Sequence, residues 1–136
     1  MDNKLKLEIV TPHGPVWSGD VDEVTASGSE GDFGVLPGHT DFVTTLKIGM
    51  LQAKSGGQQT IFFVNTGYAE VGAEKVLVLA DSSERAEGID VERAKAAKER
   101  AEERLRKEEN IDFNRAQAAL ERAIIRMQVA ERKRQI

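Results

Sequence analysis

Glycine and proline are distributed unevenly along this chain of 136 residues, and their distribution divides it in two. All twelve glycines and all three prolines lie at or before Gly88, and neither residue type occurs after it. Because glycine and proline interrupt regular elements, and their absence permits long ones, we expect short strands before this point and helices after it. We therefore divide the chain into a β-rich domain over residues 1–84 and a helical domain over residues 85–136.

The first domain contains short apolar runs separated by residues that favour turns. Leu5, Leu7 and Ile9 alternate with charged residues, which is typical of a strand with one buried face. Similar runs recur up to Asp81, and segments such as Asn65-Thr66-Gly67 have the composition of turns. We predict a β-sandwich of nine or ten short antiparallel strands. Residues 76–79 are apolar on both faces, so we place them in a central strand between the two layers.

Two helices are predicted in the second domain, over residues 91–108 and 113–134. They begin with similar motifs, IDVERA at residues 89–94 and IDFNRA at residues 111–116. The aspartate can cap the free N–H groups of the first helical turn, and the isoleucine can pack on the alanine that follows. The repetition favours a structural role for Asp90, as an N-cap, over a ligand-binding role.

The apolar residues of the second helix recur in steps of three and four, which is a heptad pattern. They are Phe113, Ala116, Leu120, Ala123, Met127 and Ala130, and they match Ala94, Ala97, Ala101 and Leu105 on the first helix. The pattern predicts an antiparallel helical hairpin. Burial of apolar area contributes about 25 cal/mol per Å², so a seam made mostly of alanine is weaker than a leucine seam. We expect that the hairpin can open while the β-sandwich stays folded.

The net charge of −4 combines two domains of opposite sign. Residues 1–84 carry 5 basic and 12 acidic side chains, whereas residues 85–136 carry 14 basic and 11 acidic ones. Within the second domain, residues 113–136 hold 6 basic and 2 acidic side chains. We expect the last helix to favour an acidic partner, although such charges are also typical of a solvated helix face.

Several functional classes lack their sequence signals. The chain has no cysteine, so it forms no disulfide, and neither a P-loop nor an HExxH motif occurs. His13 and His39 lie in separate turns without the partners of a catalytic triad. No run approaches about 18 apolar residues and no leader is recognisable, which favours a soluble chain that starts near its mature end. We expect no catalytic residue, no metal site and no obligatory cofactor.

Three separated segments resemble the epsilon subunit family of bacterial F-type ATP synthases. They are LEIVTPHGPVW at residues 7–17, GDFGVLPGHT at residues 31–40 and ERAEGIDVERAKAAKERAEERL at residues 84–105. An alanine- and arginine-rich helix follows, so that the resemblance covers nearly the whole chain. The sequence departs from the family at Asp41-Phe42, where members commonly carry Pro-Leu or similar residues.

The resemblance implies a ten-stranded antiparallel β-sandwich followed by an α-helical hairpin, in a non-catalytic subunit of the central stalk. In this family the sandwich binds the gamma subunit and the ring of c subunits, and the helices inhibit ATP hydrolysis. Such a subunit lies at the cytoplasmic face of the bacterial inner membrane, as a peripheral part of the complex. The likeness places Glu30, Asp32 and His39 at the c ring, although exposed turn residues of this kind can also be merely solvated.

The resemblance also gives the basic helices a role. Extended into the catalytic head, the second helix would bring Arg115, Arg122 and Arg126 to an acidic loop of the beta subunits. The chain alone leaves open a different function, a basic helical adaptor that binds nucleic acid. That adaptor would use the basic residues Arg122, Arg126, Arg132, Lys133 and Arg134. The overall negative charge argues against it, and we expect no nucleic acid as a partner.

A regulatory ATP site is a further implication of the resemblance. The family associates a motif I/L-D-x-x-R-A with nucleotide binding, and Ile89, Asp90, Arg93 and Ala94 match it. The full set expected to bind ATP is Glu84, Ile89, Asp90, Arg93, Ala94, Arg100, Arg122 and Arg126. Helical spacing supports this set, because Arg93 and Arg100 share one face of the first helix and Arg122 and Arg126 share one face of the second.

Four converging guanidinium groups would favour a triphosphate, with Glu84 and Asp90 accepting hydrogen bonds from adenine or ribose. Two observations support the alternative, purely structural interpretation. The second copy of the motif shows that it can be a simple helix start. In addition, the acidic residues Glu87, Glu92 and Glu99 are placed to neutralise the arginines instead.

Overall fold

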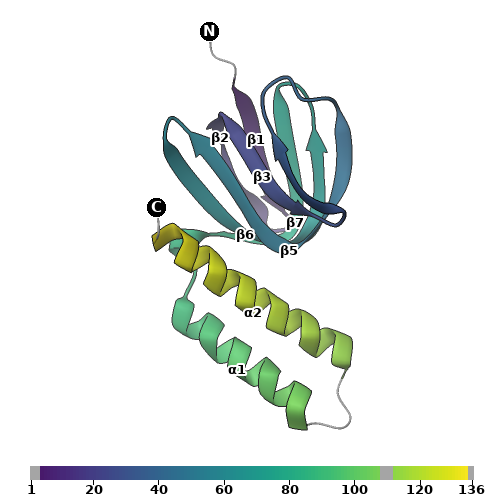
Figure 1. The fold of residues 1–136 in the computed structure, drawn as a ribbon, viewed down its shortest axis with the longest axis vertical. Coiled ribbons are helices and arrows are strands. Elements are labelled where there is room, and N and C mark those ends of the chain that lie inside the picture. Colours follow the sequence, from purple (N-terminus) through teal and green to yellow (C-terminus); the bar gives the residue numbers. More distant parts are fainter. Residues whose placement is uncertain (1–3, 108–111, 135–136) are drawn as a thin grey trace.

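The computed structural model describes residues 4–107 and 112–134, which form seven strands, a short 3₁₀ helix and two α-helices (Figure 1). The strands are β1 (Leu5–Thr11), β2 (Gly14–Val21), β3 (Glu23–Gly28), β4 (Gly31–Val35), β5 (Phe42–Ser55), β6 (Gln58–Val71) and β7 (Lys75–Arg85). The 3₁₀ helix η1 (Ala86–Gly88) joins β7 to α1 (Val91–Lys107), and α2 (Phe113–Arg134) completes the hairpin. β-strands followed by a helical hairpin are the architecture that the sequence predicts.

All seven described strands belong to one sheet, in the order β2-β1-β7-β6-β5-β3-β4. The sheet curls on itself (Figure 1). Side chains from both of its ends enter one core. Trp17 of β2 meets Phe62 of β6 edge to face, with ring centroids 5.7 Å apart, although these strands are not neighbours in the sheet. Contacts of this kind across the interior give the two layers of a sandwich.

The structure describes seven strands rather than the nine or ten predicted. The difference arises because some segments with the composition of turns continue a strand and do not reverse the chain. Residues 65–67 lie inside β6, where Thr66 has a φ of 52° and Gly67 a φ of 148°. Phe62 and Val64 face the core before this kink, and Ala69 and Val71 face it afterwards. The kink therefore shifts the alternation by one residue as β6 passes from one layer to the other.

Glycine is required at position 67 by its positive φ and also by the close approach of β7. A Cβ atom on Gly67 would lie 2.1 Å from the carbonyl oxygen of Leu79. Only a residue without a side chain fits this position.

The prediction that all strands are antiparallel is wrong for β7, which pairs with β1 in parallel. The other pairs of described strands are antiparallel.

β7 is central in the sheet, as predicted, but only one of its faces is buried near residues 76–79. Val76 and Val78 are buried in the core, whereas Leu79 is 43% exposed. The prediction that residues 76–79 lie between two layers is therefore wrong. Their inner face meets the sandwich core, and their outer face is left uncovered in this chain.

Candidate functional site

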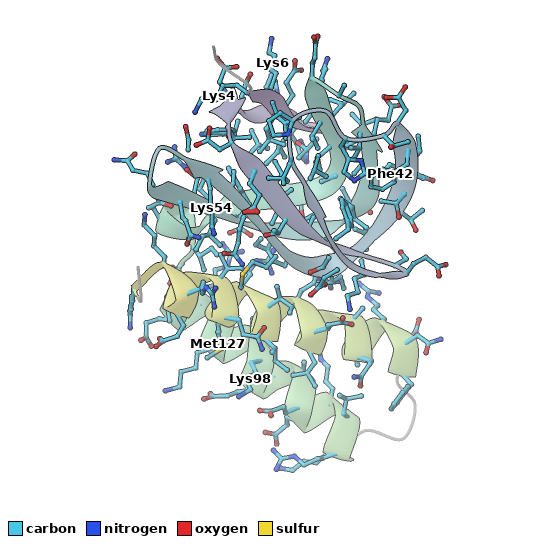
Figure 2. All side chains as sticks on the ribbon, turned by 45° about the horizontal axis from the view of Figure 1, so that its top comes forward. Lys4, Lys6, Phe42, Lys54, Lys98 and Met127 are labelled. Atoms are coloured by element: carbon cyan, nitrogen blue, oxygen red, sulfur yellow. The ribbon has the colours of Figure 1, made fainter. Side chains whose placement is uncertain are left out.

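The helical hairpin is docked on the sandwich through α2. Figures 1 and 2 show α2 between the sheet and α1, with Lys98 of α1 on the far side of α2. The contact is a second apolar cluster, separate from the sandwich core. Its buried members are Ile48, Ile61, Phe63, Ala86, Ile89, Val129 and Ala130. Strands β5 and β6 thus have a second apolar face, which α2 covers.

The seam between α1 and α2 follows the predicted heptad spacing at its alanines. Ala94 and Ala101 are buried on α1, and Ala116 and Ala123 are buried on α2, whereas Ala130 belongs to the second apolar cluster. Small side chains allow the two helices to approach closely, and they bury little apolar area for each contact. The seam therefore contributes little to holding the hairpin closed.

The predicted seam is wrong at Phe113, which is 61% exposed. Phe113 is the first residue of α2, at the end that projects away from the sheet (Figure 1). Met127 is half-buried, and it lines a groove beside the sheet together with Met50. The heptad spacing correctly predicted the buried alanines but not the positions of Phe113 and Met127. A heptad describes packing against one helix, whereas α2 packs on the sheet as well as on α1.

Arg126 makes the most specific contact between the hairpin and the sandwich. Its Nε donates a hydrogen bond to Oε2 of Glu84, with 2.6 Å between the two atoms. Its guanidinium carbon lies 4.4 Å from the centroid of the Phe63 ring, which is the geometry of a cation–π interaction. Two of the residues predicted to bind ATP are thus brought together, with Phe63 as a third partner that the sequence did not indicate.

A second, longer ion pair lies further along α2. Nζ of Lys133 is 3.8 Å from Oε2 of Glu87, and a guanidinium nitrogen of Arg85 is 3.5 Å from the same oxygen. Arg126 and Lys133 are seven residues apart, so both point from one face of α2 towards the segment that leads out of β7. The carboxylates of Glu84 and Glu87 therefore engage two of the basic residues on which a nucleic-acid adaptor would depend.

The IDVERA motif has a structural role in this conformation. The backbone N–H of Arg93 donates to Oδ1 of Asp90 at 3.0 Å, which is an N-cap. Asp112 caps α2 in the same way through the N–H of Arg115, at 3.1 Å. Ile89 is buried in the second apolar cluster and Ala94 in the seam.

Arg93, Arg100 and Arg122 are predicted to converge with Arg126 on a ligand, and Arg115 belongs with Arg126 to the predicted inhibitory set. Arg93, Arg100 and Arg115 are exposed, and Arg122 is half-buried. Within residues 4–107 and 112–134, the side chains of these four arginines form no ion pair. Glu87, expected as a neutralising partner, contacts Arg85 and Lys133 instead. In the docked conformation, Arg126 alone among the five has a carboxylate partner.

The residues predicted to meet the rotor lie along β4. Glu30 is exposed in the turn before this strand, Asp32 is exposed on it, and His39 follows its other end. Nδ1 of His39 lies 2.7 Å from the carbonyl oxygen of Thr40, and its ring centroid is 5.2 Å from that of Phe42. Asp32 thus lies on an edge strand, which Glu30 precedes and the half-buried His39 follows.

Four large apolar side chains in the described part of the sandwich are exposed. One of them, Leu36, lies in the segment after β4 and is 59% exposed, and the other three lie on the outer surface of β5, β6 and β7. These three form what we call the outer patch, Val43, Tyr68 and Leu79, which are 67%, 55% and 43% exposed. Tyr68 and Leu79 are directly paired across β6 and β7, and Val43 pairs with Glu70 on the adjoining strand. Such a cluster is a candidate contact surface for another protein. The alternation of apolar residues in the sequence did not reveal this patch, because an apolar residue on the outer face of a strand has the same sequence signal as one in the core.

Among the described helices, none is long and apolar enough to cross a membrane. The comparisons with known proteins agree with the two-part architecture. The family "ATP synthase, Delta/Epsilon chain, beta-sandwich domain" matches residues 4–86. The family "ATP synthase, Delta/Epsilon chain, long alpha-helix domain" matches residues 87–131.

Curated relatives and solved structures give the same result. The ATP synthase epsilon chain of Thermodesulfovibrio yellowstonii is 61% identical over 107 residues, which are 79% of this chain and 76% of the relative. That of Geotalea uraniireducens is 56% identical over 107 residues, 79% of this chain and 78% of the relative. A chain of the Euglena gracilis mitochondrial ATP synthase has the same fold, with a TM-score of 0.81 at 23% identity over 98% of this chain and 82% of that chain.

The pair formed by Arg126 and Glu84 predicts a measurable coupling. We expect Arg126→Gln and Glu84→Gln each to destabilise the docked hairpin, and the double variant to cost less than the sum of the two. The coupling should be about 0.5–1 kcal/mol, because both side chains are only partly buried. Urea unfolding of all variants, followed by helical circular dichroism, measures it. Arg132→Gln, an exposed change on the same helix, is the control, and strictly additive effects would contradict a direct interaction.

Proposed function

We propose, because this chain belongs to the ATP synthase delta/epsilon chain family, that it is a non-catalytic central-stalk subunit of an F-type ATP synthase. Its sandwich would hold it on the rotor, and its hairpin would regulate ATP hydrolysis. As part of that complex it would lie peripherally at the cytoplasmic face of the bacterial inner membrane. The observation that carries this proposal is the basic helix α2, which docks on the sandwich through the second apolar cluster and meets α1 through a seam of small residues.

Two surfaces of the sandwich suit the two rotor partners. The outer patch of Val43, Tyr68 and Leu79 offers apolar area to a protein surface, and we assign it to the gamma subunit. The exposed residues Glu30 and Asp32, with the half-buried His39, would face the c ring. Neither surface is covered by the hairpin, so the sandwich can stay on the rotor whatever the hairpin does.

Inhibition would follow from a change in the partners of α2. In the docked state, Glu84 and Phe63 engage Arg126. Extension would release Arg126 and bring it, with Arg115 and Arg122, to an acidic loop of the beta subunits. The exchange of one carboxylate partner for another keeps the cost of breaking the docked pair small, because a basic group is paired in both states.

Regulatory ATP binding would stabilise the docked state. The proposed ligands are the eight residues of the predicted set, from Glu84 to Arg126, of which Arg126 and Glu84 are already in contact. A phosphate group would compete with Glu84 for Arg126, and Arg93, Arg100 and Arg122 have unpaired guanidinium groups in the described structure. A ligand that binds only the docked state shifts the equilibrium towards it by mass action.

The inhibitory role predicts the effect of removing the hairpin. Deletion of residues 89–136 should raise ATP hydrolysis by the assembled enzyme without preventing assembly. Because the deletion also uncovers Ile61 and Phe63, a full-length variant with Arg115, Arg122 and Arg126 changed to Gln is the second arm. We expect that variant to raise hydrolysis as well, as measured by phosphate release. Unchanged hydrolysis in both arms would exclude the inhibitory role.

The ATP proposal predicts heat on titration of the isolated chain with ATP. Calorimetry should show binding to the wild type and at least tenfold weaker binding to Arg93→Ala, which removes one charge-assisted contact of about 1.5–3 kcal/mol. Lys107→Ala, an exposed change at the end of α1, is the matched control. Equal heat from wild type and Arg93→Ala, or no heat at millimolar ATP, would leave the arginines with structural and inhibitory roles only.

A further inference from the structure

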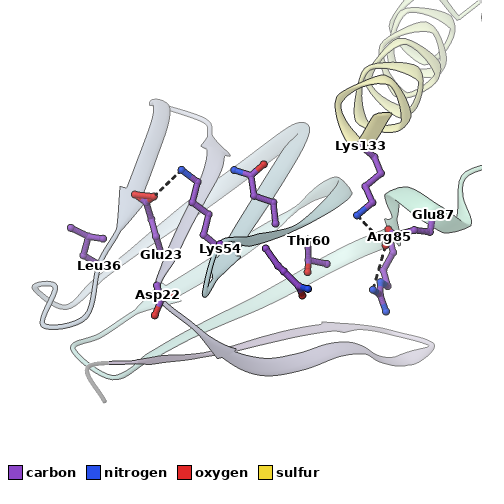
Figure 3. Close-up of a pocket in the computed structure, with 11 residues that line it drawn as sticks. Asp22, Glu23, Leu36, Lys54, Thr60, Arg85, Glu87 and Lys133 are labelled. Carbon is purple, nitrogen blue, oxygen red and sulfur yellow. Dashed lines mark hydrogen bonds and ion pairs between the residues drawn. The ribbon is translucent and has the colours of Figure 1, made fainter. Parts of the chain in front are cut away.

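The surface of β6 beneath α2 contains one polar residue in an otherwise apolar row. Ile61 and Phe63 point outward into the cluster that Val129 and Ala130 complete. Alternation along the strand places Gln59 on the same face, two residues before Ile61. Gln59 lines a cavity of about 930 Å³ together with Lys133 from the last turn of α2 (Figure 3). Gln59 therefore lies at the edge of the docked interface, under the C-terminal end of α2.

The amide oxygen of Gln59 is buried without a hydrogen-bond partner. It is the one buried side-chain nitrogen or oxygen in this condition among the residues that the structure describes. The two lysines around the cavity have carboxylate partners of their own, because Lys133 is paired with Glu87 and Lys54 with Glu23, each at 3.8 Å. A buried acceptor to which the protein supplies no donor is less stable than the same acceptor in bulk water.

We propose that Gln59 sets the docking equilibrium of the hairpin by destabilising the docked state. Undocking of α2 would return the amide oxygen to water, so the penalty applies only while the hairpin is docked. Its size corresponds to about 5- to 150-fold in the ratio of docked to undocked molecules. The inference rests on the proposed function in one respect, which is the movement of the hairpin. It adds Gln59 as a residue that shifts the equilibrium towards the undocked state.

The penalty opposes the favourable contacts already described. Arg126 with Glu84 and Phe63, and the apolar cluster around Val129, stabilise the docked state. An apolar residue of the same length at position 59 would remove the penalty and extend the row of Ile61 and Phe63.

The absence of cysteine from the chain allows a direct test by thiol labelling. Val129→Cys places a thiol in the docked interface, and Val78→Cys places one in the sandwich core, both at fully buried positions. The rate of labelling by a thiol reagent reports how often each site opens. In the full-length chain with Val129→Cys, the change Gln59→Met keeps the length of the side chain and removes its polar atoms. Gln58→Met, an exposed neighbour in the same strand, is the control.

We expect Gln59→Met to slow labelling at position 129 about 5- to 150-fold, while Gln58→Met leaves it unchanged. Labelling at position 78 should be much slower than at position 129 in the wild type. Equal labelling rates at position 129 with and without Gln59→Met would overturn the role of Gln59 but not the movement of the hairpin. An ordered water that satisfies the amide oxygen would give this result. Equal rates at positions 78 and 129 in the wild type would show that the hairpin opens only on global unfolding, and would overturn the movement as well.

Discussion

The architecture depends on the apolar run Ile61-Phe62-Phe63-Val64 in β6, which requires cover on both faces of one strand. Phe62 and Val64 enter the sandwich core, and Ile61 and Phe63 point outward. A strand of this kind is stable only between two apolar layers. The second layer is α2, so the need to cover Ile61 and Phe63 positions the whole hairpin.

The docked interface combines strong and weak contacts. The apolar cluster and the Arg126–Glu84–Phe63 contact stabilise docking, and the alanine seam adds little. The amide of Gln59 is the group that we propose opposes docking. The same Arg126 is the residue that a phosphate group or an acidic protein loop would bind. In the proposed regulation, Arg126 exchanges one carboxylate partner for another as α2 leaves the sandwich.

Local patterns in the sequence predict most of the fold. The absence of glycine and proline after Gly88 predicted the helices, and the repeated IDxxRA motif predicted the cap at Asp90 that the structure confirms. The strand count could not be predicted, because Gly67 permits a kink within a strand as readily as it permits a turn. Phe63 as a partner of Arg126 was equally inaccessible, since two residues far apart in sequence meet only once α2 is docked.

The central claim is that α2 exchanges between docked and undocked states while the sandwich stays folded. Spin labels on cysteines introduced at Ser18 and Gln128, both exposed, would measure the distance between the sandwich and α2 in the isolated chain. The account predicts two distance populations, with the longer one growing about two- to fivefold when Glu84→Gln removes the partner of Arg126, as expected for a contact of about 0.5–1 kcal/mol. A single short distance, unchanged by Glu84→Gln, would contradict it.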